Sequence, residues 1–218
     1  RGLGDVYKRQ NIAGNTPEEY CEMAEKLSST DVDMIEMNIS CPNVKSGGVQ
    51  FGTSCESVGS ITSAVRKHCT KPLIVKLSPN VTDIAEIAKS AEANGADAIS
   101  MINTLTGMRI DINTKRPIIR NNTGGMSGPA VFPVAVRMVW QVSNAVKIPI
   151  IGMGGISTWQ DAVEMMIAGA SALQIGTVFF SDPYAPIKIA EGINEYLDKN
   201  GMKSVTELTG TILSLIHI

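Results

Sequence analysis

Histidine is almost absent from this chain, which has only His68 and His217 among 218 residues. Both are poorly placed for catalysis, so a histidine-based zinc site and a Ser-His-Asp triad are nearly excluded. If the protein is an enzyme, we expect its acid–base group to be a cysteine, a lysine or a carboxylate.

Long apolar runs, a targeting signal and an excess of charge are missing too. No apolar run approaches the ~18 residues of a membrane span, and no signal-peptide pattern opens the chain. Lys plus Arg number 19 and Asp plus Glu 21, which gives a net charge of -2. The four cysteines, at positions 21, 41, 55 and 69, show no CxxC spacing. We therefore expect a cytoplasmic protein with no nucleic-acid and no membrane partner.

The two ends of the chain do not match its middle. Residues 1–10, RGLGDVYKRQ, and the final LSLIHI resemble translated sequencing-adapter sequence. We expect residues 1–10 to be a non-native leader, residues 11–210 to be the folded domain, and residues 211–218 to be a non-native tail. The alternative is a natural terminal strand and a frayed tail.

Between these ends, short apolar runs alternate with helical patterns. We expect strands at residues 33–40, 73–78, 98–103, 148–153 and 172–178, and helices at residues 53–69, 81–94, 133–146, 158–168 and 183–199. Capping boxes are expected at Thr53–Glu56 and Ser157–Gln160, and residues 104–131 form a longer connection. This βα repetition predicts parallel strands with right-handed crossovers.

Both a doubly wound sheet and a (β/α)8 TIM barrel fit this alternation. Asn38, Lys76 and Asn103 each lie near the C-terminal end of an apolar strand, where barrel enzymes place their chemistry, and this favours the barrel. A full barrel needs about 250 residues and eight strands. We therefore expect an incomplete barrel whose first two to three strands are missing, with a possible strand end at residues 11–14.

Two features within the strands suggest chemistry. Lys76 lies between Val75 and Leu77, where a buried cation is costly unless it is paired. It is either a snorkelling lysine or a cation directed at an anionic ligand, such as a reduced flavin. The segment Asn38-Ile-Ser-Cys-Pro-Asn43 places Cys41 between amides where a strand opens into a loop. An isolated cysteine is usually a small buried hydrophobe, but this setting favours a functional role.

Glycine turns form a third feature. Gly152-Met-Gly-Gly155 and Gly176-Thr177 both follow expected strands. Glycines there allow backbone N–H groups to approach a phosphate, and phosphate sites after the last two strands recur in barrels. Simple tight turns are the alternative.

Six segments in this order, NISCPNVKSGG, VKLSPN, MINTLTGMR, NNTGGMSGPA, IPIIGMGGI and QIGT, together resemble the dihydroorotate dehydrogenase family. The similarity runs from about Asn11 to Gly210. Cys41 and the loop from Thr104 to Pro129 resemble class I and its NAD-linked subgroup. The resemblance implies an FMN-bound barrel that oxidises dihydroorotate to orotate in pyrimidine synthesis. It also implies an iron–sulfur/FAD partner subunit and a homodimer core of a heterotetramer.

The resemblance also implies a role for individual residues. Cys41 matches the base that removes the C5 proton while the C6 hydride goes to the flavin. Substrate contacts match Asn38, Asn43, Asn103 and Thr104. FMN contacts match Asn11, Asn38, Lys76, Ile102, Gly128, Gly154, Gly155, Gly176 and Thr177. The family's first strands have no counterpart before Asn11, so we expect these 218 residues to bind FMN poorly.

Two other interpretations stay open. One is a dihydropyrimidine dehydrogenase-like flavin barrel, which a substrate panel would distinguish. The other is an inactive fragment of a gene.

Overall fold

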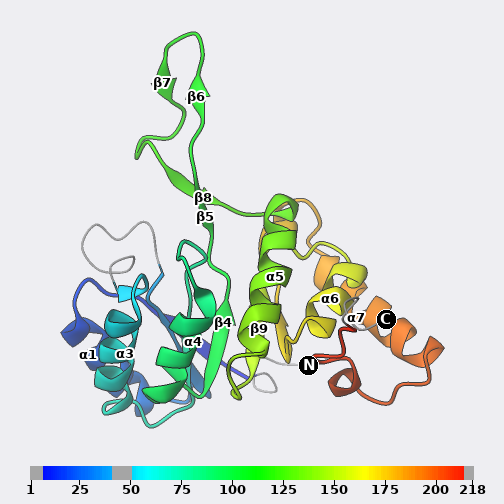
Figure 1. The fold of residues 1–218 in the computed structure, drawn as a ribbon, viewed down its shortest axis with the longest axis horizontal. Helices are drawn as coiled ribbons and strands as arrows, with labels where there is room; N and C mark the ends of the chain where they lie inside the picture. Colours follow the sequence, from blue (N-terminus) through cyan, green and yellow to red (C-terminus); the bar gives the residue numbers. More distant parts are fainter. Residues whose placement is uncertain (1–6, 41–50, 214–218) are drawn as a thin grey trace. The chain divides into compact units, whose positions relative to one another are not determined.

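A computed structural model describes residues 7–40 and 51–213 of the chain. The chain divides into two compact units, of which the first ends at Asn103 and the second begins at Thr104. Figure 1 follows the elements of both units along the sequence.

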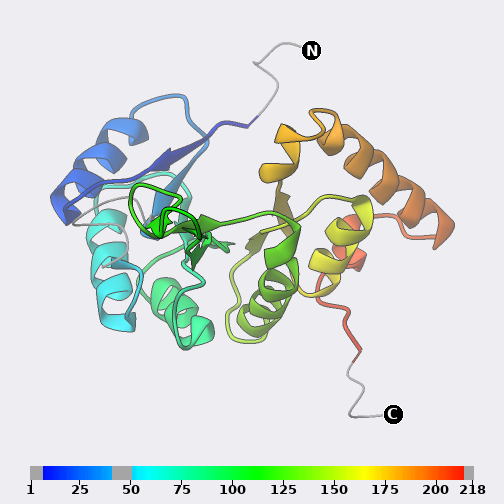
Figure 2. The same ribbon diagram turned by 90° about the horizontal axis from the view of Figure 1, so that it is seen from above.

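The first unit is built on four parallel strands in sequence order. These are β1 (Arg9–Ile12), β2 (Met34–Asn38), β3 (Leu73–Lys76) and β4 (Ala98–Met101). The helices between them are α1 (Pro17–Ser28), α3 (Cys55–Arg66) and α4 (Ile84–Ala93). Figure 2 shows these three helices on one side of the strands, which is the arrangement expected of right-handed βα repeats.

Side-chain caps begin α1, α3 and α4. Thr16, Ser54 and Asp83 each accept a hydrogen bond from a backbone N–H in the first turn. The predicted capping box at Thr53–Glu56 is wrong by one residue, because Ser54 has the extended backbone of a cap and its hydroxyl accepts from the Ser57 N–H at 3.2 Å. The helix also ends at Arg66 rather than near Cys69.

The two faces of this sheet differ sharply. Apolar side chains that face the helices are fully buried in β2, β3 and β4, namely Ile35, Met37, Leu73, Val75, Ile99 and Met101. Neighbouring residues in each strand point the other way because side chains alternate along a strand. That opposite face therefore carries Asn11, Glu36, Asn38, Lys76 and Ser100, which in a barrel is the interior.

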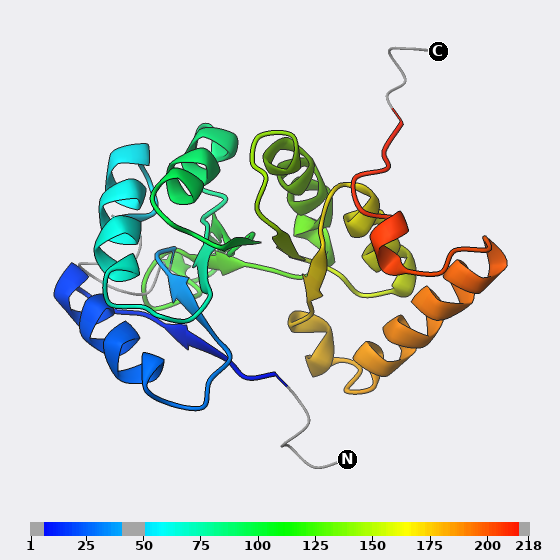
Figure 3. The ribbon, with the colours of Figure 1, turned by 90° about the horizontal axis from the view of Figure 1, so that it is seen from below.

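The second unit has two parallel strands, β9 (Ile150–Met153) and β10 (Ala172–Gln174). Its helices are α5 (Phe132–Ser143), α6 (Trp159–Ile167) and α7 (Ala185–Lys199), with short 3-10 helices at η2 (Pro129–Val131), η3 (Thr177–Phe180) and η4 (Val205–Glu207). Figure 3 shows these three α-helices outside β9 and β10. This unit therefore repeats the arrangement of strands and covering helices of the first unit.

Two details of the second unit differ from the sequence prediction. The capping box of α6 joins Thr158 and Asp161, not Ser157 and Gln160, because the Asp161 carboxylate also accepts from the Ser157 and Thr158 N–H groups. The strand expected at residues 172–178 ends at Gln174, since a 3-10 helix begins at Thr177.

The connection after Asn103 contains strands that the sequence did not predict. β5 (Leu105–Gly107) pairs antiparallel with β8 (Gly124–Met126), and β6 (Ile110–Asp111) pairs with β7 (Arg116–Pro117). Figure 1 shows these ribbons end to end, with β6 and β7 at the tip. Strands of two or three residues leave no readable alternation of apolar and polar residues.

The parallel βα repeats of the two units confirm the predicted fold class, an incomplete (β/α)8 barrel. β1 begins at Arg9, so the strand end expected near Asn11 is part of the parallel sheet. No helix in the described part of the chain is long and apolar enough to cross a membrane.

Candidate functional site

A row of polar residues crosses the carboxyl ends of the strands in the first unit. Asn38 of β2 is paired with Lys76 of β3, and Lys76 is paired with Ser100 of β4. Partners in adjacent parallel strands present their side chains to the same face. The register thus brings together Asn38 and Lys76, both predicted to have functions, with Ser100, which the sequence analysis did not identify.

Ser40 links two of the predicted amides. Its hydroxyl lies 3.0 Å from Asn38 Oδ1, to which it donates, and it accepts from Asn103 Nδ2 at 2.7 Å. Asn103 Nδ2 also lies 3.3 Å from Asn38 Oδ1. These bonds occupy the side-chain oxygen Oδ1 of Asn38, whereas its Nδ2 group has no partner among residues 7–40 and 51–213. Asn38 therefore presents hydrogen-bond donors.

Buried groups hold this network in place. The hydroxyl of Tyr20, a fully buried residue of α1, donates to the backbone carbonyl oxygen of Asn38 at 2.8 Å. The Asn103 N–H donates to the Leu77 carbonyl at 3.1 Å, which ties the end of β4 to the end of β3. Ile102, a predicted FMN contact, is buried next to Asn103. Such anchoring reduces the freedom of the amides and so preorganises them for a ligand.

Lys76 is half-buried, whereas its neighbours Val75 and Leu77 are fully buried. No carboxylate of the described residues lies within ion-pair distance of its ammonium group. Because no described counter-ion compensates this charge, we favour the interpretation that Lys76 binds an anionic ligand over the interpretation that its role is purely structural.

Asn11 and Glu36 form a second polar pair on the same face. They are register partners in β1 and β2, and Asn11 Nδ2 donates to Glu36 Oε2 at 2.7 Å. The sequence analysis identified Asn11 but missed Glu36. The available signal was its spacing of two residues from Asn38, which places both on one face of the strand.

Glycine turns converge within the second unit. A Cβ atom on Gly155 would lie 2.7 Å from the Gly128 carbonyl oxygen, and one on Gly128 would lie 3.8 Å from Thr177 Cγ2. Gly154 and Gly155 have φ values of 124° and 79°, which other residues rarely adopt. A Cβ atom on Gly176 would meet no described heavy atom within 4 Å. The turns after β9 and β10 thus come together with Gly128 and leave open backbone at Gly176.

Thr104 lies beside a further glycine. A Cβ atom on Gly125, in β8, would lie 2.2 Å from Thr104 Oγ1. Only glycine allows the β8 backbone to approach this predicted substrate contact so closely.

Cys41 and Asn43 lie outside the described residues, so their predicted roles stay predictions. The other cysteines are reduced and belong to the helical layer. Cys21 is half-buried in α1, where burial, followed by the charges of Glu18 and Glu25, raises the pKa of its thiol. Cys55 opens α3 and is exposed, and Cys69 is buried just beyond that helix. None of these three stands at the carboxyl end of a strand.

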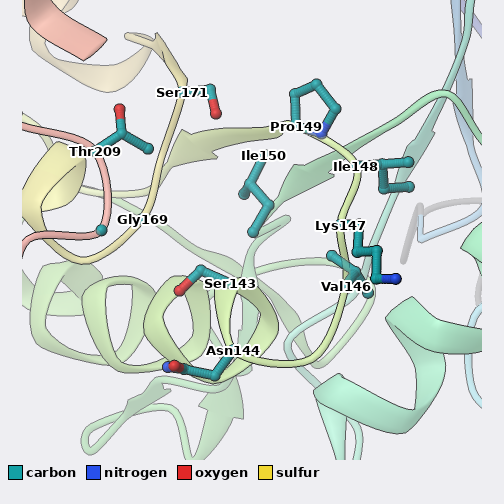
Figure 4. Close-up of a pocket in the computed structure, with 11 residues that line it drawn as sticks. Ser143, Asn144, Val146, Lys147, Ile148, Pro149, Ile150, Gly169, Ser171 and Thr209 are labelled. Atoms are coloured by element: carbon teal, nitrogen blue, oxygen red, sulfur yellow. The ribbon is translucent and has the colours of Figure 1, made fainter. Parts of the chain in front are cut away.

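A separate pocket of about 370 Å³ lies at the opposite end of β9. Figure 4 shows Ser143 and Asn144 at the end of α5, facing Pro149 and Ile150 at the start of the strand. Lys147 is the one ionisable residue among those that line it. Barrel chemistry belongs to the carboxyl ends of the strands, so we do not assign the catalytic site to this pocket.

No cluster of three or more His, Cys, Asp or Glu residues suited to a metal ion occurs in the described ranges. At the strand ends of the first unit the polar groups include amides, hydroxyls and the Lys76 ammonium group, which suit an organic ligand with hydrogen-bonding edges. In the second unit the glycine turns suit a phosphate.

Comparison with known proteins gives one consistent result. The family model described as dihydroorotate dehydrogenase matches residues 7–197. The dihydroorotate dehydrogenase B (NAD(+)) catalytic subunit of Bacteroides fragilis is 58% identical over 203 residues, covering 93% of this chain and 67% of that protein. The subunit of the same name from Alkaliphilus oremlandii is 56% identical over 202 residues, with coverage of 93% and 67%. That of Geotalea uraniireducens is 56% identical over 205 residues, with coverage of 94% and 67%.

Proposed function

The chain belongs to the dihydroorotate dehydrogenase family, and on that premise we propose that it is the catalytic part of a flavin enzyme that oxidises dihydroorotate to orotate. The observation that carries the proposal is the polar row of β2, β3 and β4, in which Asn38 donors stand beside the Lys76 cation, which pairs with no carboxylate of residues 7–40 and 51–213. This would place the enzyme in the cytoplasmic synthesis of pyrimidines.

The residues of the first unit fit the ring of FMN. The ring has carbonyl and N–H groups along one edge, and it gathers negative charge there when it is reduced. Lys76 supplies a cation, Asn38 supplies donors, and Asn11 supplies an amide on the same face. Ser100 Oγ is a buried polar atom that lacks a hydrogen-bond partner among the described residues, as expected where a polar ligand belongs.

The residues of the second unit fit a phosphate. A Cβ atom at Gly176 would meet no described heavy atom within 4 Å, so this backbone is open to an anion. Gly154 and Gly155 have positive φ values, and Gly155 packs against Gly128 and Phe132. Turns of this kind present N–H groups to phosphate oxygens. The phosphate is the chemical feature that separates FMN from riboflavin.

We propose that Cys41, Thr104 and three amide side chains carry the proton and substrate chemistry. FMN, when bound, would supply the acceptor for the hydride at C6 of dihydroorotate. The thiolate of Cys41 removes the proton from C5, which requires nearby donors because a free thiol has a pKa of about 8.5. Asn38, Asn43 and Asn103 hold the planar acid through amide hydrogen bonds, and Thr104 adds a hydroxyl. Ser40 keeps the Asn38 and Asn103 amides in fixed orientations.

The electrons then leave through a second subunit. The similar proteins are named catalytic subunits of an NAD(+) enzyme, which supports a partner that passes electrons to NAD. We propose an iron–sulfur/FAD partner and a heterotetramer with a homodimer core. NAD reduction is then expected only when the partner is present, while the catalytic subunit alone reduces an artificial acceptor.

A substrate panel tests the function. Protein expressed from its natural gene is expected to oxidise dihydroorotate to orotate, measured by product absorbance with an artificial electron acceptor. Turnover of dihydrouracil without turnover of dihydroorotate would instead establish the dihydropyrimidine dehydrogenase-like alternative. Failure to oxidise either compound by a folded, flavin-loaded protein would overturn both.

A further inference from the structure

Glu36 is a buried carboxylate that takes no part in the chemistry proposed above. Its side chain is 2% exposed and lies in the middle of β2, on the polar face of the sheet. A buried carboxylate loses its hydration, and such groups are normally compensated by donors at both oxygens.

Only one oxygen of Glu36 accepts a hydrogen bond from the described residues. Oε2 accepts from Asn11 Nδ2 at 2.7 Å. Oε1 has no hydrogen-bond partner in the described part of the chain, and Arg9 Nη1 lies 3.8 Å from it. The main hydrogen bond of this carboxylate is therefore directed at the Asn11 amide.

This bond determines which end of the Asn11 amide faces away from the sheet. An ionised carboxylate only accepts hydrogen bonds, so it selects the amide orientation that turns Nδ2 toward β2. Asn11 Oδ1 is left on the other side, and Asn11 is exposed with no described partner for that oxygen. Asn38 on the same face shows the reverse arrangement, because its Oδ1 is occupied and its Nδ2 is available.

We propose that Glu36 is a positioning residue, which fixes the Asn11 amide so that Oδ1 serves as a hydrogen-bond acceptor for an N–H group of the flavin ring. This rests on the proposed function, in which Asn11 contacts FMN. An acceptor at Asn11 and donors at Asn38 match a ring edge that carries both N–H and carbonyl groups. Glu36 touches neither the ring nor the substrate and acts through Asn11 alone.

FMN titration of single variants, followed by flavin fluorescence, tests the assignment in protein expressed from its natural gene. Glu36→Gln keeps the size of the side chain but offers either a donor or an acceptor, so FMN is expected to bind about 3- to 10-fold more weakly. Asn11→Asp places a second carboxylate against Glu36, so FMN is expected to bind at least about 10-fold more weakly.

The exchanged pair E36Q/N11D is the decisive variant. The introduced glutamine donates to the introduced aspartate, whose other oxygen still faces the ligand as an acceptor. FMN affinity is expected to return to within about threefold of that of the unsubstituted protein. If the two changes acted independently, their losses of affinity would instead multiply. A merely structural role of Glu36 predicts no such recovery.

The outcomes separate clearly. An exchanged pair as weak as the product of the two single effects would overturn the assignment, as would unchanged FMN affinity in Glu36→Gln. If Glu36→Gln alone does not fold, as judged by circular dichroism, comparison of Asn11→Asp with the exchanged pair decides the question in the same way. Absence of FMN binding by the unsubstituted protein would overturn the proposed function itself, whereas intact binding with no recovery overturns only the role of Glu36.

Discussion

The position of Lys76 is difficult to explain by packing alone. It stands in register with Asn38 and Ser100 at the end of a strand whose other residues are buried and apolar. Hydrophobic packing does not stabilise an ammonium group, and no carboxylate in the described part of the chain pairs with this one. A flavin that becomes anionic on reduction would supply the missing negative charge.

Replacing Lys76 with methionine tests this charge. The reduced flavin would lose its cation, so the midpoint potential of bound FMN is expected to fall by about 30 mV or more, which is about 1.4 kcal/mol for a two-electron couple. A spectroelectrochemical titration measures it. Lys89→Met is the matched control, because Lys89 is exposed on α4 and pairs with Glu86 at 2.7 Å. Equal potentials in the unsubstituted protein and Lys76→Met would remove Lys76 from the flavin site.

The base is tested at Cys41. Cys41→Ser raises the pKa of the proton acceptor, so flavin reduction by dihydroorotate at neutral pH is expected to slow by about 100-fold or more. Rapid mixing without oxygen measures the rate. Cys55→Ser, at the exposed start of α3, is expected to leave the rate unchanged. A Cys41→Ser protein as fast as the unsubstituted one would require another base.

At the residue scale, the sequence identified the polar residues that interrupt apolar strands, such as Asn38 and Lys76. It did not identify Glu36, because a single acidic residue in DMIEMNIS carries no sign of its partner on β1. Nor did it reveal that Ser40 bridges Asn38 and Asn103, which are 65 residues apart in sequence. Such pairings depend on register, which only the folded sheet provides.

At the element scale, the turns after β9 and β10 are the parts most specifically shaped for a ligand. The turn after β9 requires positive φ values, and its backbone touches Gly128. The turn after β10 is open at Gly176. The requirement for a positive φ can therefore be tested at Gly155, and the access of a ligand to the backbone can be tested separately at Gly176.

Two alanine substitutions distinguish an effect on stability from an effect on FMN binding. Gly155→Ala is expected to lower stability by about 1–3 kcal/mol and to weaken FMN binding, because its φ is 79° and its Cβ would meet the Gly128 carbonyl. Gly176→Ala is expected to leave the melting temperature unchanged, since no described atom obstructs its Cβ, but to weaken FMN binding about 10-fold. Thermal melts and FMN titrations measure the two effects. Unchanged FMN affinity in Gly176→Ala would exclude this turn from the phosphate site.

Hydrophobic periodicity predicted the βα elements from β2 onward, but not helix α1 (Pro17–Ser28), and it did not give the limits of the elements. Ser54 rather than Thr53 caps α3, because the choice between adjacent hydroxyl residues depends on which one has the extended backbone. β5 to β8 escaped prediction because pairs of very short strands depend on long-range pairing rather than on local pattern.

At the scale of the whole molecule, the two units contribute different chemistry. The first unit offers amides and a cation, and the second offers glycine turns. The proposed cofactor FMN has a polar ring and a phosphate, so its binding to protein expressed from the natural gene is expected to stabilise that protein.

Comparison of FMN with riboflavin tests this match. FMN at 100 times its dissociation constant is expected to stabilise the protein by about 2.7 kcal/mol, which a rise in melting temperature reports. Riboflavin at the same concentration is expected to give a smaller rise, because it lacks the phosphate that the glycine turns would hold. Equal shifts for the two compounds would show that the turns do not recognise phosphate.

Anaerobic mixing of the flavin-loaded protein with dihydroorotate tests the central claim most directly. The yellow colour of the oxidised flavin is expected to bleach in a single turnover, with one orotate formed for each flavin reduced. A protein that holds FMN and keeps its colour in the presence of excess dihydroorotate would contradict the assignment.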